Sequence, residues 1–199
     1  MPRKSQERVT MTTPSISRNR QSGFTLVELL IVAIILAILA AIVVPQFANT
    51  AAGASDAALR TNLSGIRSAV ELYRQQHAQV YPGANASNTV VCGTGPGSGA
   101  AGTGQAFDDQ LTMYTNAAGV ACSVQNDGGT IYPFGPYIKE NAVPANPVST
   151  VATIVVNTDT NLGMQSATAG GGWLFSSATG KFLADDTNTD TNGVRYDSY

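Results

Sequence analysis

Side chains that offer oxygen ligands alternate with threonines in the segment ADDTNTDTNGVRYDSY at 184–199. The set consists of Asp186, Asn188, Asp190, Asn192 and, after a glycine, Asp197. Ca²⁺ takes six to eight hard oxygen ligands, which protein loops supply around a sharp turn. The pattern therefore predicts a calcium site at these five residues, with calcium as an optional and not a required cofactor.

The spacing of these ligands differs from that of an EF-hand loop. When Asn188 is counted as the first position, the twelfth position is Tyr199 and not the glutamate that an EF-hand uses. A calcium site here would be of another kind. The alternative is a solvated, mobile segment, which is common where Asn, Asp and Thr predominate.

Residue patterns typical of catalysis do not stand out in the sequence. His77 is the single histidine, and it ends an apolar stripe rather than pairing with a nucleophile. Asp108 and Asp109 are adjacent, so their side chains diverge on a helix, and we expect them in the first turn of a short helix. The sequence therefore predicts a protein that is not an enzyme.

A carboxylate also stands near the start of a long apolar run, GFTLVELLIVAIILAILAAIVVPQF at 23–47. From Phe24 to Val44 the only charged side chain is Glu28, and the run is long enough to cross a bilayer as a helix. An ionised carboxylate in mid-bilayer costs roughly 2.5–3.5 kcal/mol on insertion scales, so its presence predicts a partner that offsets the cost. The alternative is a glutamate tolerated at the membrane surface.

The charges on the two sides of this run differ in sign. Residues 1–23 contain five bases and one acid, whereas the remainder contains six bases and twelve acids. The bases before the run are expected to stay in the cytoplasm, which places the rest of the chain outside it. The acidic remainder argues against a nucleic-acid partner, because phosphate binding needs clustered Lys and Arg.

The apolar run resembles the class III leader junction and first helix of type IV pilins and type II secretion pseudopilins. The resemblance implies that a prepilin peptidase cuts after Gly23 and methylates the new amino group of Phe24. It also implies that Glu28 matches the glutamate of the family and pairs with the Phe24 amine of a neighbouring subunit. An α-amino group is largely cationic near neutral pH, so it suits the carboxylate.

The same resemblance implies a helical homopolymer. Its subunit would be anchored in the inner membrane by one span, with a periplasmic head, and would later lie in a periplasmic or surface filament. The implied partners are prepilin peptidase, the inner-membrane assembly platform with its ATPase, and minor pseudopilins.

Two functions remain open at this stage. The first is a subunit of a type II secretion pseudopilus, which helps to export folded proteins. The second is a type IV pilus subunit for adhesion, motility or DNA uptake. Gly-Pro-Tyr at 135–137 and Asn-Pro at 146–147 resemble segments of pseudopilin heads, which favours the first. Many major pseudopilins bind calcium in a C-terminal loop, which agrees with the predicted ligand set.

One long helix must position these groups. The sequence predicts it from Phe24 to about Val80, with an interruption at Pro45. Its second half carries an apolar stripe at helical spacing. The stripe consists of Leu59, Leu63, Ile66, Val70, Tyr73 and His77. We expect it to pack on a globular head, with a coiled coil as the alternative.

The head is expected to contain a disulfide and a small sheet. Cys92 and Cys122 lie in a part of the chain that is expected to be exported, where disulfides form; a reduced buried pair is the alternative. The glycine-rich stretch 93–104 is typical of a flexible loop. β-Branched residues at 150–158 predict a strand, and 171–185 predicts a hairpin whose aromatic residues would cover the helical stripe.

Together these patterns predict an α+β fold, in which a long N-terminal helix packs on a small antiparallel β-sheet head. The predicted segments are a cleaved basic leader (1–23), a hydrophobic transmembrane or filament-core helix (24–45), an amphipathic helix (46–81), and a globular head with an acidic tail (82–199).

Overall fold

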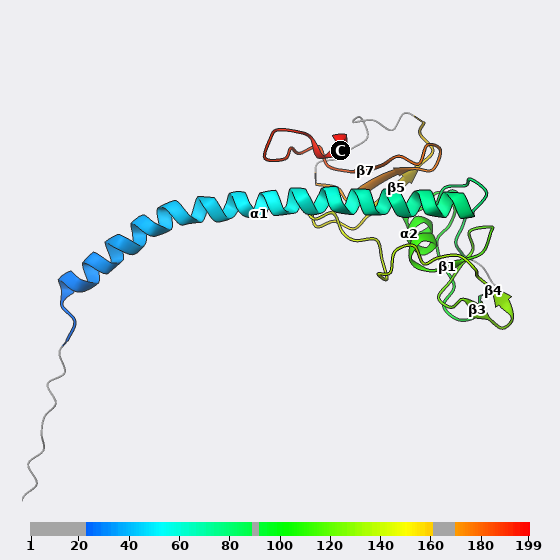
Figure 1. The fold of residues 1–199 in the computed structure, drawn as a ribbon, viewed down its shortest axis with the longest axis horizontal. Coiled ribbons are helices and arrows are strands. Elements are labelled where there is room, and N and C mark those ends of the chain that lie inside the picture. Colours follow the sequence, from blue (N-terminus) through cyan, green and yellow to red (C-terminus); the bar gives the residue numbers. More distant parts are fainter. Residues whose placement is uncertain (1–22, 89–91, 161–169) are drawn as a thin grey trace, which may run out of the picture. The chain divides into compact units, whose positions relative to one another are not determined.

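The computed structural model describes residues 23–88, 92–160 and 170–199 (Figure 1). One helix, α1 (Leu26–Gln76), confirms the predicted long helix. It ends where Ala78 and Gln79 take positive φ angles of 52° and 66°. Such angles are uncommon for residues other than glycine and are incompatible with a right-handed helix, so they stop it shortly before Val80.

The chain divides after Val44 into two compact units. In the first, the part of α1 from Leu26 to Val44 has a mean hydropathy of 3.2, and none of its side chains is buried. α1 is continuous through Pro45, where the sequence predicted an interruption. Proline removes only one main-chain N–H from a helix, so the helix can continue through it.

In the second unit, a three-stranded sheet has the order β5 (Ile154–Asn157), β6 (Trp173–Ser176), β7 (Phe182–Ala184). β6 and β7 form the predicted antiparallel hairpin. β5, in contrast, runs parallel to β6, so the sheet is mixed rather than wholly antiparallel. Parallel neighbours need a connection of a dozen or more residues, and the segment 158–172 is long enough to supply it.

Smaller elements complete the head. Two antiparallel pairs join β1 (Tyr114–Thr115) to β2 (Ala121–Cys122) and β3 (Asn126–Asp127) to β4 (Thr130–Ile131). A 3₁₀ helix, η1 (Tyr196–Ser198), follows the sheet. The α+β class is therefore confirmed.

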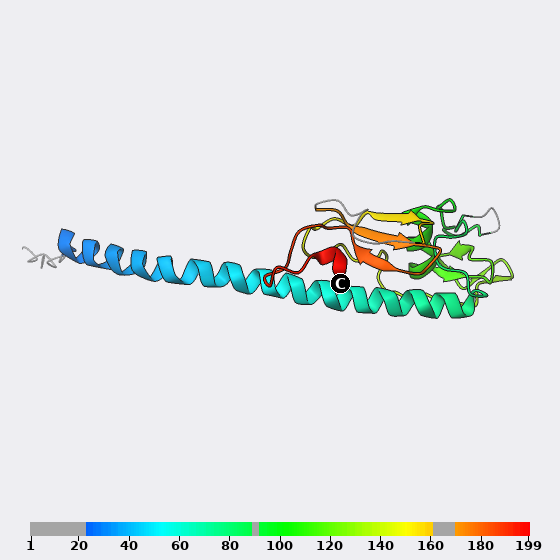
Figure 2. The same cartoon turned by 90° about the horizontal axis from the view of Figure 1, so that it is seen from above.

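The core of the head forms between the second half of α1 and the sheet, which lie alongside each other in Figure 2. Every residue of the predicted stripe is buried. Five of them join the apolar core with aromatic residues of α2 and the sheet, among them Phe107, Trp173, Phe175 and Phe182. Fully burying a side chain of this size contributes about 1.5–3 kcal/mol, so this packing is a main source of stability for the head.

The short helix α2 (Gly104–Thr112) begins at the N-cap Thr103, whose Oγ1 accepts a hydrogen bond from Ala106 N at 3.2 Å. The helix starts earlier than the sequence suggested, so Asp108 and Asp109 lie in its middle and not in its first turn. They organise loops instead, because Asp108 accepts a hydrogen bond from Val143 N at 2.6 Å.

Asp109 orders the glycine-rich stretch that was expected to be flexible. Its Oδ2 accepts hydrogen bonds from Ser98 N at 2.7 Å and from Gly99 N at 3.1 Å. A Cβ on Gly99 would lie 2.1 Å from Ala106 N, and one on Gly104 would lie 2.1 Å from Ile154 O. These glycines permit close backbone packing, which composition alone cannot distinguish from flexibility.

Candidate functional site

The N-terminal end of α1 contains a reciprocal cap. Thr25 precedes the helix, and its Oγ1 accepts a hydrogen bond from Glu28 N at 3.2 Å. The Glu28 carboxylate accepts in return from Thr25 N at 3.3 Å and from Thr25 Oγ1 at 3.2 Å. This is the capping box that Thr-x-x-Glu encodes, and the sequence signal was present although the prediction for Glu28 did not use it.

Around this cap lie the other residues of the predicted assembly site. Gly23 and Phe24 stand just before α1, and 80% of the Phe24 side chain is exposed. Residues 1–22 of the predicted leader (1–23) lie outside the described residues. The carboxylate of Glu28 is favourably placed beside the positive end of the helix dipole.

The surface of α1 beyond Glu28 is almost wholly apolar and uncovered. Large side chains between Leu26 and Val44 are 43–80% exposed. The segment is long and apolar enough to cross a membrane. Water is a poor solvent for such a surface, so lipid tails or copies of the same helix are the environments that suit it.

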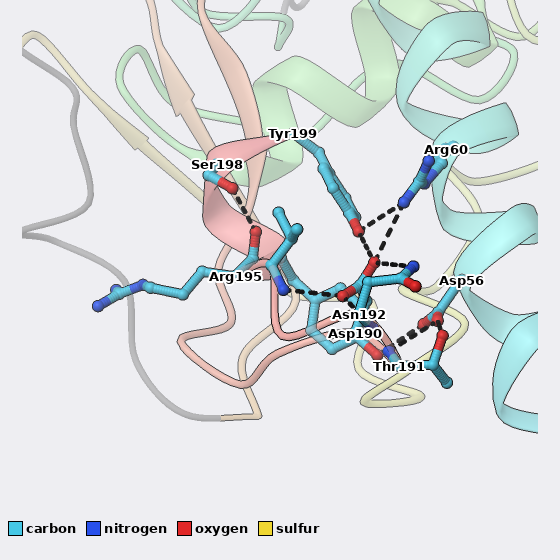
Figure 3. A network of polar contacts seen from close by, with 10 residues as sticks. Asp56, Arg60, Asp190, Thr191, Asn192, Arg195, Ser198 and Tyr199 are labelled. Atoms are coloured by element: carbon cyan, nitrogen blue, oxygen red, sulfur yellow. Dashed lines mark hydrogen bonds and ion pairs between the residues drawn. The ribbon is translucent and has the colours of Figure 1, made fainter. Parts of the chain in front are cut away.

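At the other end of the chain, Asp190 and Asn192 of the predicted calcium ligands take part in a network of protein groups (Figure 3). Asp190 accepts hydrogen bonds from the Tyr199 hydroxyl at 2.5 Å, Arg60 Nη2 at 3.2 Å and Val194 N at 2.8 Å. Asn192 adds its main-chain N at 2.8 Å and its Nδ2 at 3.2 Å. These donors, Tyr199 foremost, hold the pKa of Asp190 well below its usual range.

Two further acids of the predicted set, Asp197 and Asp186, have partners other than those of Asp190. Asp197 pairs with Arg195 at 2.6 Å. Asp186 Oδ1 accepts from Asn188 N at 2.9 Å and from Gly170 N at 3.2 Å, and its buried Oδ2 has no hydrogen-bond partner among the residues that the structure describes. Within the described ranges, these acids do not converge as one group of metal ligands. The calcium site therefore stays a prediction.

Residues that the sequence reasoning missed fix this loop. Asp56 on α1 is 6% exposed and accepts a hydrogen bond from the Tyr196 hydroxyl at 2.6 Å. It also accepts from Thr191 N and Thr191 Oγ1, both at 3.3 Å. No local sequence signal identifies these contacts, because Asp56 is separated in sequence from Thr191 by 135 residues and from Tyr196 by 140.

The predicted disulfide between Cys92 and Cys122 is present, with the two Cα atoms 5.8 Å apart. Asp127 accepts hydrogen bonds beside it, from Thr94 Oγ1 at 2.7 Å and Gly93 N at 2.6 Å. These bonds lower the pKa of Asp127. The bridge ties Cys92 to β2, and Asp127 fastens the start of the glycine-rich stretch to β3.

His77 is a core residue, as the sequence predicted. It is 2% exposed and its ring stacks on that of Tyr73 at a centroid distance of 3.8 Å. Nδ1 lies 2.8 Å from Tyr73 O, and Nε2 lies 3.0 Å from Thr115 Oγ1. Burial lowers the pKa of His77, and with both ring nitrogens engaged the side chain has a structural role.

Comparisons with known proteins agree with the geometry of the N-terminal segment. Residues 18–44 match the prokaryotic N-terminal methylation motif. The type II secretion system core protein G of Pseudomonas aeruginosa is 39% identical over 59 residues, which cover 30% of this chain and 42% of that protein. No solved structure is significantly similar to the chain. The motif and the similarity support a pilin-like structural subunit and not an enzyme.

Proposed function

We propose that this pilin-like subunit polymerises into a type II secretion pseudopilus and helps to export folded proteins. The observation that supports this most is the uncovered apolar half of α1, with one carboxylate at its start. The similarity to core protein G favours secretion over a surface pilus. The apolar half would lie first in the inner membrane, with the head in the periplasm, and then in the filament core.

In this proposal, the new N-terminus forms after Gly23 and meets a carboxylate of the next subunit. Prepilin peptidase would cut and methylate at Phe24, and the amine would pair with Glu28 of a neighbouring copy. The remaining partners are the assembly platform, its ATPase and minor pseudopilins. A pair between two charged groups away from water is stronger than the hydrogen bonds of the carboxylate to the uncharged donors of the capping box, so assembly would favour the exchange.

The variant Glu28→Gln tests the role of the negative charge separately from the role of the side chain in the capping box, because it removes the charge and keeps a side chain that can cap. Glutamine at this position still serves a capping box, so the helix should begin normally. A hydrogen bond to a charged group contributes about 1.5–3 kcal/mol, so each addition step should become at least roughly tenfold less favourable. We expect normal membrane insertion of the variant and few filaments after shearing. Abundant filaments from Glu28→Gln would contradict the pairing.

Glu71→Gln is the matched control on the same helix. Glu71 pairs with Arg74 at 3.3 Å on the exposed face, and surface pairs contribute about 0–1 kcal/mol. This variant should assemble as the wild type does.

The choice between the two filament types requires a deletion strain. Loss of exported proteins, with the antigen confined to the cell envelope of the wild type, would support the pseudopilus. Unchanged export, with abundant antigen in sheared surface filaments, would support a type IV pilus instead.

A further inference from the structure

The C-terminal loop, defined here as residues 185–199, lies against one turn of α1 (Figure 3). That turn presents an acceptor, Asp56, and four residues later a donor, Arg60. Asp56 accepts from the hydroxyl of Tyr196 at 2.6 Å. Arg60 Nη2 donates to the hydroxyl of Tyr199 at 2.7 Å and to Asp190 at 3.2 Å. The helix and the loop are therefore complementary in both charge and hydrogen bonding.

Arg60 also covers the aromatic ring of the loop. Its guanidinium carbon lies 4.5 Å from the centroid of the Tyr199 ring. A planar guanidinium can stack on an aromatic ring and donate hydrogen bonds at its edge at the same time, which a lysine cannot do. One side chain thus holds both Asp190 and Tyr199.

The carboxylate of Asp190 has no exposed surface and is surrounded by donors of the chain itself. These donors are Arg60, Tyr199, Asn192 and Val194. A buried carboxylate needs either such donors or a bound cation. A metal ion at Asp190 would have to displace Arg60, because two cations cannot share this position without strong repulsion.

The loop's other acids also have internal partners, except that Asp186 Oδ2 has none among the described residues. Asp197 is paired with Arg195, and Asp186 Oδ1 accepts from two main-chain N–H groups. The donor set that a calcium loop would offer to the ion is largely committed to the protein.

We propose that the C-terminal loop is a metal-independent latch, closed on α1 by Asp56 and Arg60, with Arg60 in the position that a metal cation would take at Asp190. The latch belongs to the single subunit, so it holds whether the filament is a pseudopilus or a pilus. It joins the end of the described chain to the start of the amphipathic half of α1. The loop is then folded before any metal or neighbouring subunit is present.

The test uses the full chain in detergent, in either excess EDTA or excess CaCl₂. Thermal unfolding and limited proteolysis are followed for the wild type and for Arg60→Gln. The wild type should give the same Tm and the same loop protection in both solutions. Arg60→Gln should lower the Tm by several degrees in EDTA and expose the loop to cleavage, because it leaves Asp190 buried without a cation.

Arg74→Gln is the matched control. Arg74 also forms an ion pair on α1, with Glu71, and its guanidinium carbon lies 5.0 Å from the ring centroid of Tyr81. It therefore removes the same kinds of contact from the same helix without touching the loop, and cleavage of the loop should not change. Two results would overturn the proposal. One is a wild type whose loop opens in EDTA and closes with calcium. The other is an Arg60→Gln protein as protected in EDTA as Arg74→Gln.

Discussion

The packing of α1 on the head can be tested with two leucines of the same helix. Leu63 is 1% exposed within the apolar core, whereas Leu72 is 47% exposed. Substitution by alanine therefore removes the same atoms from a buried position at Leu63 and from a half-exposed position at Leu72. The comparison isolates burial, because helix propensity changes equally at both positions.

The expected magnitudes follow from the two environments. Leu→Ala in a packed core lowers the free energy of unfolding by about 2–5 kcal/mol. This is the sum of the lost transfer free energy of the side chain and the cost of the cavity that it leaves. At Leu72 no cavity forms, and about half of the side chain already faces solvent, so the cost should be about 1 kcal/mol or less. For a unit of this size, 1 kcal/mol shifts the Tm by about 2–4 °C.

Thermal and denaturant unfolding of the full chain in detergent would measure both variants against the wild type. We expect Leu63→Ala to lower the Tm by roughly 4–20 °C and Leu72→Ala by a few degrees at most. Equal losses at the two positions would refute the assignment of the stripe to the core. A larger loss at Leu72 would show that the other face of α1 is the buried one.

Three further predictions concern the head and the part of α1 that packs on it. Burial lowers the pKa of His77, so the unfolded chain binds a proton more readily than the folded one. Stability should therefore fall as the pH drops below about 6.5 and level off below the folded pKa; comparison with His77→Gln checks this, and identical pH profiles would contradict it. Gly99→Ala should destabilise the head, because the added Cβ meets Ala106 N at 2.1 Å. Gly65→Ala, in open space on α1, should stabilise the subunit by about 0.5–1 kcal/mol in the same unfolding assay, and a loss at Gly65 would show that the site is not open.

Features set by local periodicity could be predicted from the sequence. The stripe on α1 depends only on helical spacing, and its residues are buried as expected. The hairpin of β6 and β7 depends on two short apolar arms and a turn, and it is present. The parallel pairing of β5 with β6 was not predictable in this way, because strand direction depends on the path of the connection between them.

The groups that hold the C-terminal loop illustrate a different limit. Asp190 and Arg60 are separated by 130 residues in sequence. The alternation of oxygen ligands at 186–192 is equally consistent with a metal site and with a loop whose acids bind protein donors. The sequence identified the acids and could not identify their partner. Thr25 differs, because its capping signature is local and could have been recognised.

α1 combines two kinds of burial along one helix. The apolar stripe on its second half is covered by other residues of the same chain. The burial that stabilises the head therefore needs no second subunit. Its first half has no such cover among the described residues, so the corresponding free energy becomes available only in lipid or between copies. Glu28 is the one charge in this half, and the Thr25 cap supplies its carboxylate with two neutral donors. A subunit can therefore carry the acid before assembly, and in the proposed filament a cationic amine replaces neutral donors with a stronger partner.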